Sequence, residues 1–166
     1  MDNLWAIGLS TFIYLNLLVL LAVLALYVLQ AVGLYGMANQ AGVTPRWVAF
    51  IPVVNAYIWG KIIKEIRISD YVIPRAEIVL PVAPFVYALF HNINIINTLV
   101  FLCLLVLYAV GYYRLYSLYR PDNMAVYTVL SVVFPFVVPL FFYSFRDESP
   151  LDFSPEDEKE ADADAK

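Results

Sequence analysis

The sequence predicts an all-α fold, a polytopic transmembrane helical bundle of about four to five spans followed by a disordered acidic C-terminal tail. Of the 166 residues, 63% are apolar and 14% are charged, whereas a soluble domain usually carries about 25% charged and about 45–50% apolar residues. The apolar residues also fall into several long stretches with few charges. This composition excludes a disordered chain, a nucleic-acid-binding protein and an ordinary soluble enzyme.

The charges divide the chain into a basic body and an acidic tail. Residues 1–146 contain eight Lys or Arg and five acidic residues, a net charge of +3, and residues 147–166 contain two Lys and nine acidic residues, a net charge of −7. A mildly basic body suits a membrane with anionic lipids. The tail is too polar to bury a core, so we expect residues 1–146 to form the transmembrane domain and residues 147–166 to be disordered.

The first predicted span covers residues 5–35 and is uncharged. The apolar stretch that contains it, 4–34, would reach about 46 Å as a helix, against a hydrocarbon core of about 30 Å, so one end must tilt or project into the headgroups. Its apolar region is too long for a secretory signal peptide. Asn16 lies near mid-depth, where its amide either marks an interface with a neighbouring helix or serves a ligand; the interface is favoured.

Residues 47–63 form a short apolar stretch that contains Pro52 and Asn55. Pro52 removes one backbone donor and disrupts a helix, and the amide of Asn55 could satisfy the backbone groups that are released. The segment is therefore either a short kinked span or a re-entrant or interfacial element, with Trp47 and Trp59 at the headgroups. A broken helix of this kind occurs in transporters, but a tight hairpin that packs the bundle is favoured because no charge lies between Trp47 and Gly60, where an ion would have to bind.

Residues 61–68 alternate isoleucine with charge and predict an amphipathic helix on the membrane plane. Lys61 and Glu65 are four residues apart and could form an ion pair on that helix. After this segment we expect three further spans, at residues 78–90, 93–113 and 124–143. The first of the three contains two prolines and is short for a full crossing.

An aromatic and basic stretch ends the predicted span 93–113. Its tyrosines and arginines are expected to form a band at the membrane interface; they are Tyr112, Tyr113, Arg114, Tyr116, Tyr119 and Arg120. A stripe of this composition could also bind single-stranded nucleic acid, but the apolar flanks favour the membrane.

The distribution of Lys and Arg predicts orientation. Whether or not residues 47–63 cross the membrane, the count places residues 64–77 and 114–122 in the cytoplasm and the acidic tail outside. The side of the N-terminus stays open. If residues 78–90 only dip into the bilayer, the tail lies on the cytoplasmic side instead.

Residues 34–62 resemble a group of uncharacterised small polytopic membrane proteins of Gram-positive bacteria. The shared signature is W-x-A-F-I-P-x-x-N-x-Y-x-x-G-K-I, which here begins at Trp47 and ends at Ile62 and includes Lys61. The proline-containing run from Pro121 to Pro135 is also similar. The resemblance implies a bacterial cytoplasmic membrane and brings no known activity.

Common catalytic and metal-binding motifs are absent from the sequence. One His and one Cys cannot form the usual zinc site. His91 lies between two apolar stretches and is either a polar loop residue, which is favoured, or a proton-linked group at the membrane surface. We therefore expect no enzymatic activity and no cofactor.

The sequence thus predicts a multi-pass integral membrane protein, most simply a non-enzymatic structural or accessory component of a membrane complex. Its partners would be the lipid bilayer and either a second copy of the chain or another membrane protein, and not nucleic acid. The alternative is a small transporter or channel subunit that uses the proline-broken segment 47–63.

Overall fold

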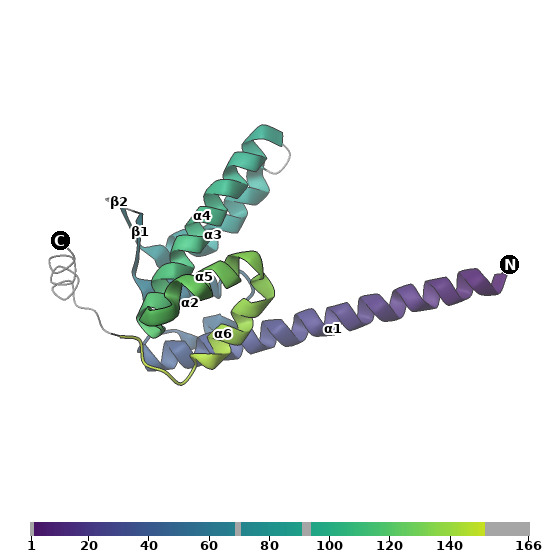
Figure 1. Cartoon of the computed structure of the whole chain (residues 1–166), viewed down its shortest axis with the longest axis horizontal. Coiled ribbons are helices and arrows are strands. Elements are labelled where there is room, and N and C mark those ends of the chain that lie inside the picture. The colour runs from purple at the N-terminus through teal and green to yellow at the C-terminus, as the bar shows by residue number, and fades with distance from the viewer. Residues whose placement is uncertain (1, 69–70, 91–93, 152–166) are drawn as a thin grey trace.

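The computed structural model describes residues 2–68, 71–90 and 94–151 and is mostly helical (Figure 1). The elements are, in order, α1 (Asp2–Gln40), η1 (Arg46–Phe50), α2 (Ala56–Ile63), β1 (Glu65–Ile68), β2 (Tyr71–Pro74), α3 (Ala76–Phe90), α4 (Asn94–Tyr119), η2 (Pro121–Asn123), α5 (Met124–Val133), η3 (Pro135–Val137) and α6 (Val138–Ser144). The prediction of a predominantly helical chain is confirmed. His91 and residues 152–166 of the acidic tail lie outside the described residues.

Two of the described helices are long and apolar enough to cross a membrane. They are Gly8–Gln40 in α1 and Ile95–Tyr119 in α4, and the bent pair α5–α6 would be a third if it formed one span. The helix α3 is apolar but has only 15 residues. These helices suit a membrane location, because a hydrocarbon core needs about 20 apolar residues of helix.

Residues 65–74 correct the prediction of an amphipathic helix. The helix α2 ends at Ile63, and Lys64 has a φ of 62°, which an α-helix cannot contain. An antiparallel pair of strands follows, in which Ile66 faces Ile73. Because residues two apart in a strand share a face, the alternation of isoleucine with charge fits a strand, and Ile66 is fully buried.

The segment 124–143 does not form the continuous span that the sequence predicts. A break at Phe134 bends the two halves by 118°. Pro135 causes this break, because a residue before proline avoids the α-helical region, and Phe134 has φ −126° and ψ 75°. The second half then returns as α6 and packs along α1, where Gly33 lets the backbone at Phe142 come close.

The return of α6 also brings the described start of the acidic tail beside the end of α4. Arg120 Nη2 and Glu148 Oε1 form an ion pair at 2.5 Å. The backbone N–H of Leu151 donates to the carbonyl of Leu118 at 2.8 Å. Residues 147–151 therefore lie against residues 118–120, which suits the cytoplasmic alternative for the tail better than a position outside.

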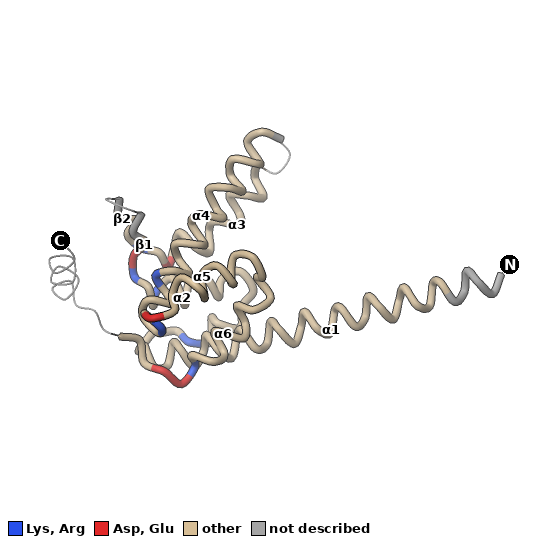
Figure 2. Tube along the Cα trace, viewed as in Figure 1, with Lys and Arg blue, Asp and Glu red and all other residues tan. Residues whose placement is uncertain are grey.

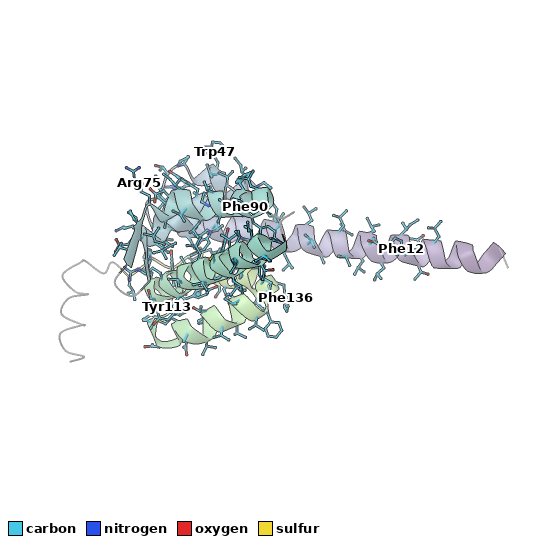
Figure 3. The ribbon with its side chains drawn as sticks, turned by 90° about the horizontal axis from the view of Figure 1, so that it is seen from above. Phe12, Trp47, Arg75, Phe90, Tyr113 and Phe136 are labelled. Carbon is cyan, nitrogen blue, oxygen red and sulfur yellow. The ribbon has the colours of Figure 1, made fainter. Side chains whose placement is uncertain are left out.

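The core lies at one end of the molecule, where α1, α2, α4 and α6 meet. The N-terminal part of α1 projects away from it, and none of the most apolar window of that helix is buried inside the chain (Figure 1). Lys, Arg, Asp and Glu gather at the end of the molecule that holds the core (Figure 2). Phe90 and Phe136 lie at the other side, away from Arg75 and toward the projecting helix (Figure 3).

We predict that Gly60→Ala lowers stability by about 1–3 kcal/mol, the usual cost of overpacking. A Cβ at Gly60 would lie 2.7 Å from the carbonyl oxygen of Ala76 and from Cα of Glu77, so α2 and α3 would have to separate. Thermal unfolding in detergent should show a lower midpoint than for the wild-type chain.

The control is Gly8→Ala, because a Cβ there meets nothing within 4 Å. Its unfolding midpoint should equal or slightly exceed that of the wild type, since alanine favours a helix. Equal midpoints for the Gly60 and Gly8 variants would contradict the described packing of α2 on α3.

Candidate functional site

Residues 46–63 run back along α1 toward Tyr27 and then return as α2. Tyr27 donates its hydroxyl proton to the carbonyl of Phe50 at 2.6 Å, and Tyr27 is about 20 Å along α1 from Gln40. Lys61 at the other end donates its ammonium to the carbonyl of Thr44 at 3.0 Å. The bond between Lys61 and Thr44 holds the start and the end of the segment together, which favours the re-entrant interpretation over a span.

Pro52 breaks this segment as the sequence predicts. Ile51 before it is extended, with φ −96° and ψ 118°, and α2 starts only at Ala56. Val53 in the turn has a φ of 67°, which is rare for a β-branched residue. Asn55 is buried with 9% of its surface exposed, at the position before α2, while Pro52 itself is exposed.

The other predicted site residues are placed apart from one another. Trp47 is 63% exposed, whereas Trp59 is buried inside the chain and does not present its ring at the surface, as the prediction of a headgroup residue requires. Asn16 is exposed on α1 and donates from Nδ2 to the carbonyl of Phe12 in its own helix at 2.8 Å. Of the polar candidates that the structure describes, Asn55 is buried in the helical bundle and Lys61 bonds a distant backbone carbonyl.

An aromatic stack joins α2, α4 and the α5–α6 pair. Trp59 lies parallel to Tyr112 with ring centroids 5.2 Å apart, and Tyr112 stacks on Tyr116 at 6.1 Å. Tyr116 also bonds Ser131 of α5 through its hydroxyl at 2.6 Å. The stack therefore packs α4 against α2 on one side and against the α5–α6 pair on the other.

The stack corrects the predicted interfacial band of tyrosines. Tyr116 and Tyr119 are buried inside the chain. Tyr113, on another face of α4, is 44% exposed. The signal that could have found the stack is the spacing of Tyr108, Tyr112, Tyr116 and Tyr119, because residues three or four apart share a face of a helix.

Tyr108 compensates for a proline inside α3. Pro84 has no N–H to bond the carbonyl of Leu80 four residues earlier, and the hydroxyl of Tyr108 donates to that carbonyl at 3.0 Å. In a membrane, a carbonyl freed by proline must find a partner within the protein. This bond therefore satisfies the carbonyl that Pro84 leaves without a partner inside α3.

A basic cavity of about 300 Å³ lies at the polar end of the molecule. It opens between the ends of three helices and the start of the tail. Its cationic lining residues are Lys61 and Lys64 at the end of α2 and Arg114 on α4, and its other polar side chains are Gln40 and Ser149. Within the described part of the chain, the lining contains no acidic side chain, and the cavity therefore suits an anion.

A second hollow of about 450 Å³ lies between α3, α4 and α5, and its lining is mostly apolar. The aromatic stack forms one wall, through Tyr108 and Tyr112. Among the described residues, no group of three His, Cys, Asp or Glu could hold a metal ion.

Comparisons of the chain with family models, with curated proteins and with solved structures found no match. The resemblance carried by residues 34–62 therefore stays a prediction. The candidate site is defined by geometry: the segment 46–63 that returns along α1, an aromatic stack that holds it, and a basic cavity beside Lys61.

We predict that Tyr108→Phe lowers stability by about 1–3 kcal/mol, the cost of a buried carbonyl left without its donor. The loss should be smaller in a Pro84→Ala background, because the restored N–H of residue 84 can bond the carbonyl of Leu80. Unfolding midpoints of the single and double variants in detergent measure this coupling.

Tyr113→Phe is the matched control, since Tyr113 is an exposed tyrosine on the same helix. It should leave the midpoint unchanged. If Tyr108→Phe costs the same in the wild-type and Pro84→Ala backgrounds, the tyrosine does not compensate for the proline.

Proposed function

We propose that the chain is a multi-pass integral membrane protein that acts as a non-enzymatic accessory component of a membrane complex. One observation carries the proposal: α1 projects from the bundle as a long apolar helix with an exposed amide, Asn16, in its middle. An amide has two N–H donors and an acceptor, and its bond to Phe12 uses one donor. An exposed amide in hydrocarbon is costly, and a neighbouring helix would relieve that cost.

The proposed topology has three crossings, by α1, α3 and α4, and two re-entrant elements, residues 46–63 and the α5–α6 pair. This topology has fewer spans than the four to five that the sequence predicts. The gathering of Lys and Arg at the polar end (Figure 2) supports a cytoplasmic location for that end. The N-terminus then lies outside, and the tail starts inside. The bacterial cytoplasmic membrane remains the proposed location.

The alternative function, a transporter or channel subunit built on Pro52 and Asn55, has less support. Neither of the two cavities described above is lined by these residues. Pro52 lies in the turn after which α2 returns to the polar end, and Asn55 stands directly before α2.

We predict that a photo-crosslinking residue at Leu20 forms adducts with a protein in native membranes, because Leu20 is one helical turn from Asn16 on the same face. The control is the same photo-crosslinking residue at position 18, which faces the other side of α1. Leu20 is 63% exposed and Leu18 is 66% exposed. Asn16→Leu should reduce the yield of adduct at position 20. Adducts are identified by mass spectrometry as a second copy or another membrane protein.

The proposal fails if neither position gives a protein adduct and the chain extracted in mild detergent migrates as a monomer. Equal yields at positions 18 and 20 would remove the role of the Asn16 face.

We predict that cysteines at positions 64 and 149 are labelled from the same side of the membrane, in a Cys103→Ser background. An N-terminal tag should be accessible only from the other side. In intact cells, a membrane-impermeant thiol reagent should label neither cysteine, and permeabilisation should expose both. Labelling of position 149 but not 64 in intact cells would show that α5–α6 crosses the bilayer.

A further inference from the structure

We infer that the basic cavity between α1, α2 and α4 binds a phosphate group, supplied either by the headgroup of an anionic phospholipid or by a soluble phosphate ester. The cavity brings together Lys61, Lys64 and Arg114 around about 300 Å³. This volume is at the lower end of the range for small-molecule sites, roughly 300–1,000 Å³.

The two lysines alone give the described lining a positive charge beyond what the adjoining helix ends offset. Three helices, α1, α2 and α4, end beside the cavity. Each C-terminus carries the equivalent of roughly −0.5 charge, so together the three ends offset roughly 1.5 of the two lysine charges. Glu65, which follows Lys64 in β1, does not line the cavity. In the described part of the tail, Glu148 is held by Arg120.

The cavity also offers hydrogen-bond donors. Lys61 uses one N–H on the carbonyl of Thr44, and an ammonium has three. Lys64 is exposed at the end of α2, and Gln40 and Ser149 supply an amide and a hydroxyl. Charged donors around a phosphate oxygen form stronger hydrogen bonds than neutral ones.

The position of the cavity makes a lipid headgroup an available source of phosphate. Both described helices long and apolar enough to cross a membrane, Gly8–Gln40 and Ile95–Tyr119, end at this cavity. The ends of membrane-spanning helices lie at the level of the headgroups. Basic pockets between helices on the cytoplasmic side are known to bind anionic headgroups. The inference goes beyond the proposed function and does not require a protein partner.

The test measures binding to the purified full chain in an uncharged detergent by the shift of its unfolding midpoint. The probes are dioleoylphosphatidylglycerol, dioleoylphosphatidylcholine and glycerol 3-phosphate. Wild-type chain should bind the anionic lipid more tightly than the zwitterionic one. Lys64→Gln and the double variant Lys61→Gln/Lys64→Gln should weaken binding of the anionic lipid by roughly fivefold per lysine removed.

Arg75→Gln is the matched control, because Arg75 is an exposed cation of the same polar end that does not line the cavity. It should bind as the wild type does, and Lys61→Arg/Lys64→Arg should retain binding. Binding of glycerol 3-phosphate that depends on the same lysines would identify soluble phosphate esters as ligands, and its absence would identify the lipid.

Equal affinity of the wild-type chain for the two lipids, with no lysine-dependent binding of glycerol 3-phosphate, would overturn the inference. So would an equal loss in Arg75→Gln and the lysine variants. The comparison of lipids uses the wild-type chain, so it decides even where a variant fails to fold. A failed crosslink at Leu20 would leave this result unaffected, which separates the two proposals.

Discussion

The return of the chain at Phe134 and Pro135 is the constraint on which the rest of the structure depends. Because Phe134 leaves the helical region, α6 runs back along α1 instead of away from α5. Gly33 and Gly36 allow this contact, since a Cβ at either would meet the backbone of α6 or the adjoining Arg146 within 3 Å. A straight helix would place residues 147–151 far from α4. The basic cavity would then lose the wall formed by residues 149–151.

The two elements proposed to be re-entrant, residues 46–63 and the α5–α6 pair, require that their interior hydrogen bonds be made within the protein. Water is absent from a bilayer core, so each backbone group that a proline frees needs a partner. Tyr27 serves the carbonyl of Phe50, and Tyr108 serves that of Leu80. Tyr116 joins Ser131 across α4 and α5. Each of these three tyrosines thus makes one hydrogen bond that joins two helical elements.

The composition and the long uncharged stretches were sufficient to predict the helical class, α1 and most of α4. They did not predict which prolines break a helix, because the effect of a proline depends on residues distant in sequence. Pro84 lies within a continuous α3, where Tyr108 bonds the carbonyl that it frees, whereas Pro52 and Pro135 lie at breaks between helices. The hairpin at residues 65–74 was missed because Ile66 and its neighbours fit either an amphipathic helix or a strand, and the φ of Lys64 decides between them. Lys61 was singled out as a candidate, but its association with Arg114 depends on tertiary packing.

The polar end combines two needs of a membrane protein that oppose each other. Helices that enter from one side bring their negative C-termini together, here those of α1, α2 and α4, and cations are needed to offset them. Arg120 is engaged by Glu148, and a hydrogen bond from Arg146 to Asp147 raises the pKa of that arginine above its ordinary value, so it stays charged. Lys61, Lys64 and Arg114 instead surround a cavity whose lining, in the described part of the chain, lacks an acidic side chain. The charge of the two lysines alone exceeds what the helix ends offset, and the excess is what an anion at the headgroup level would neutralise.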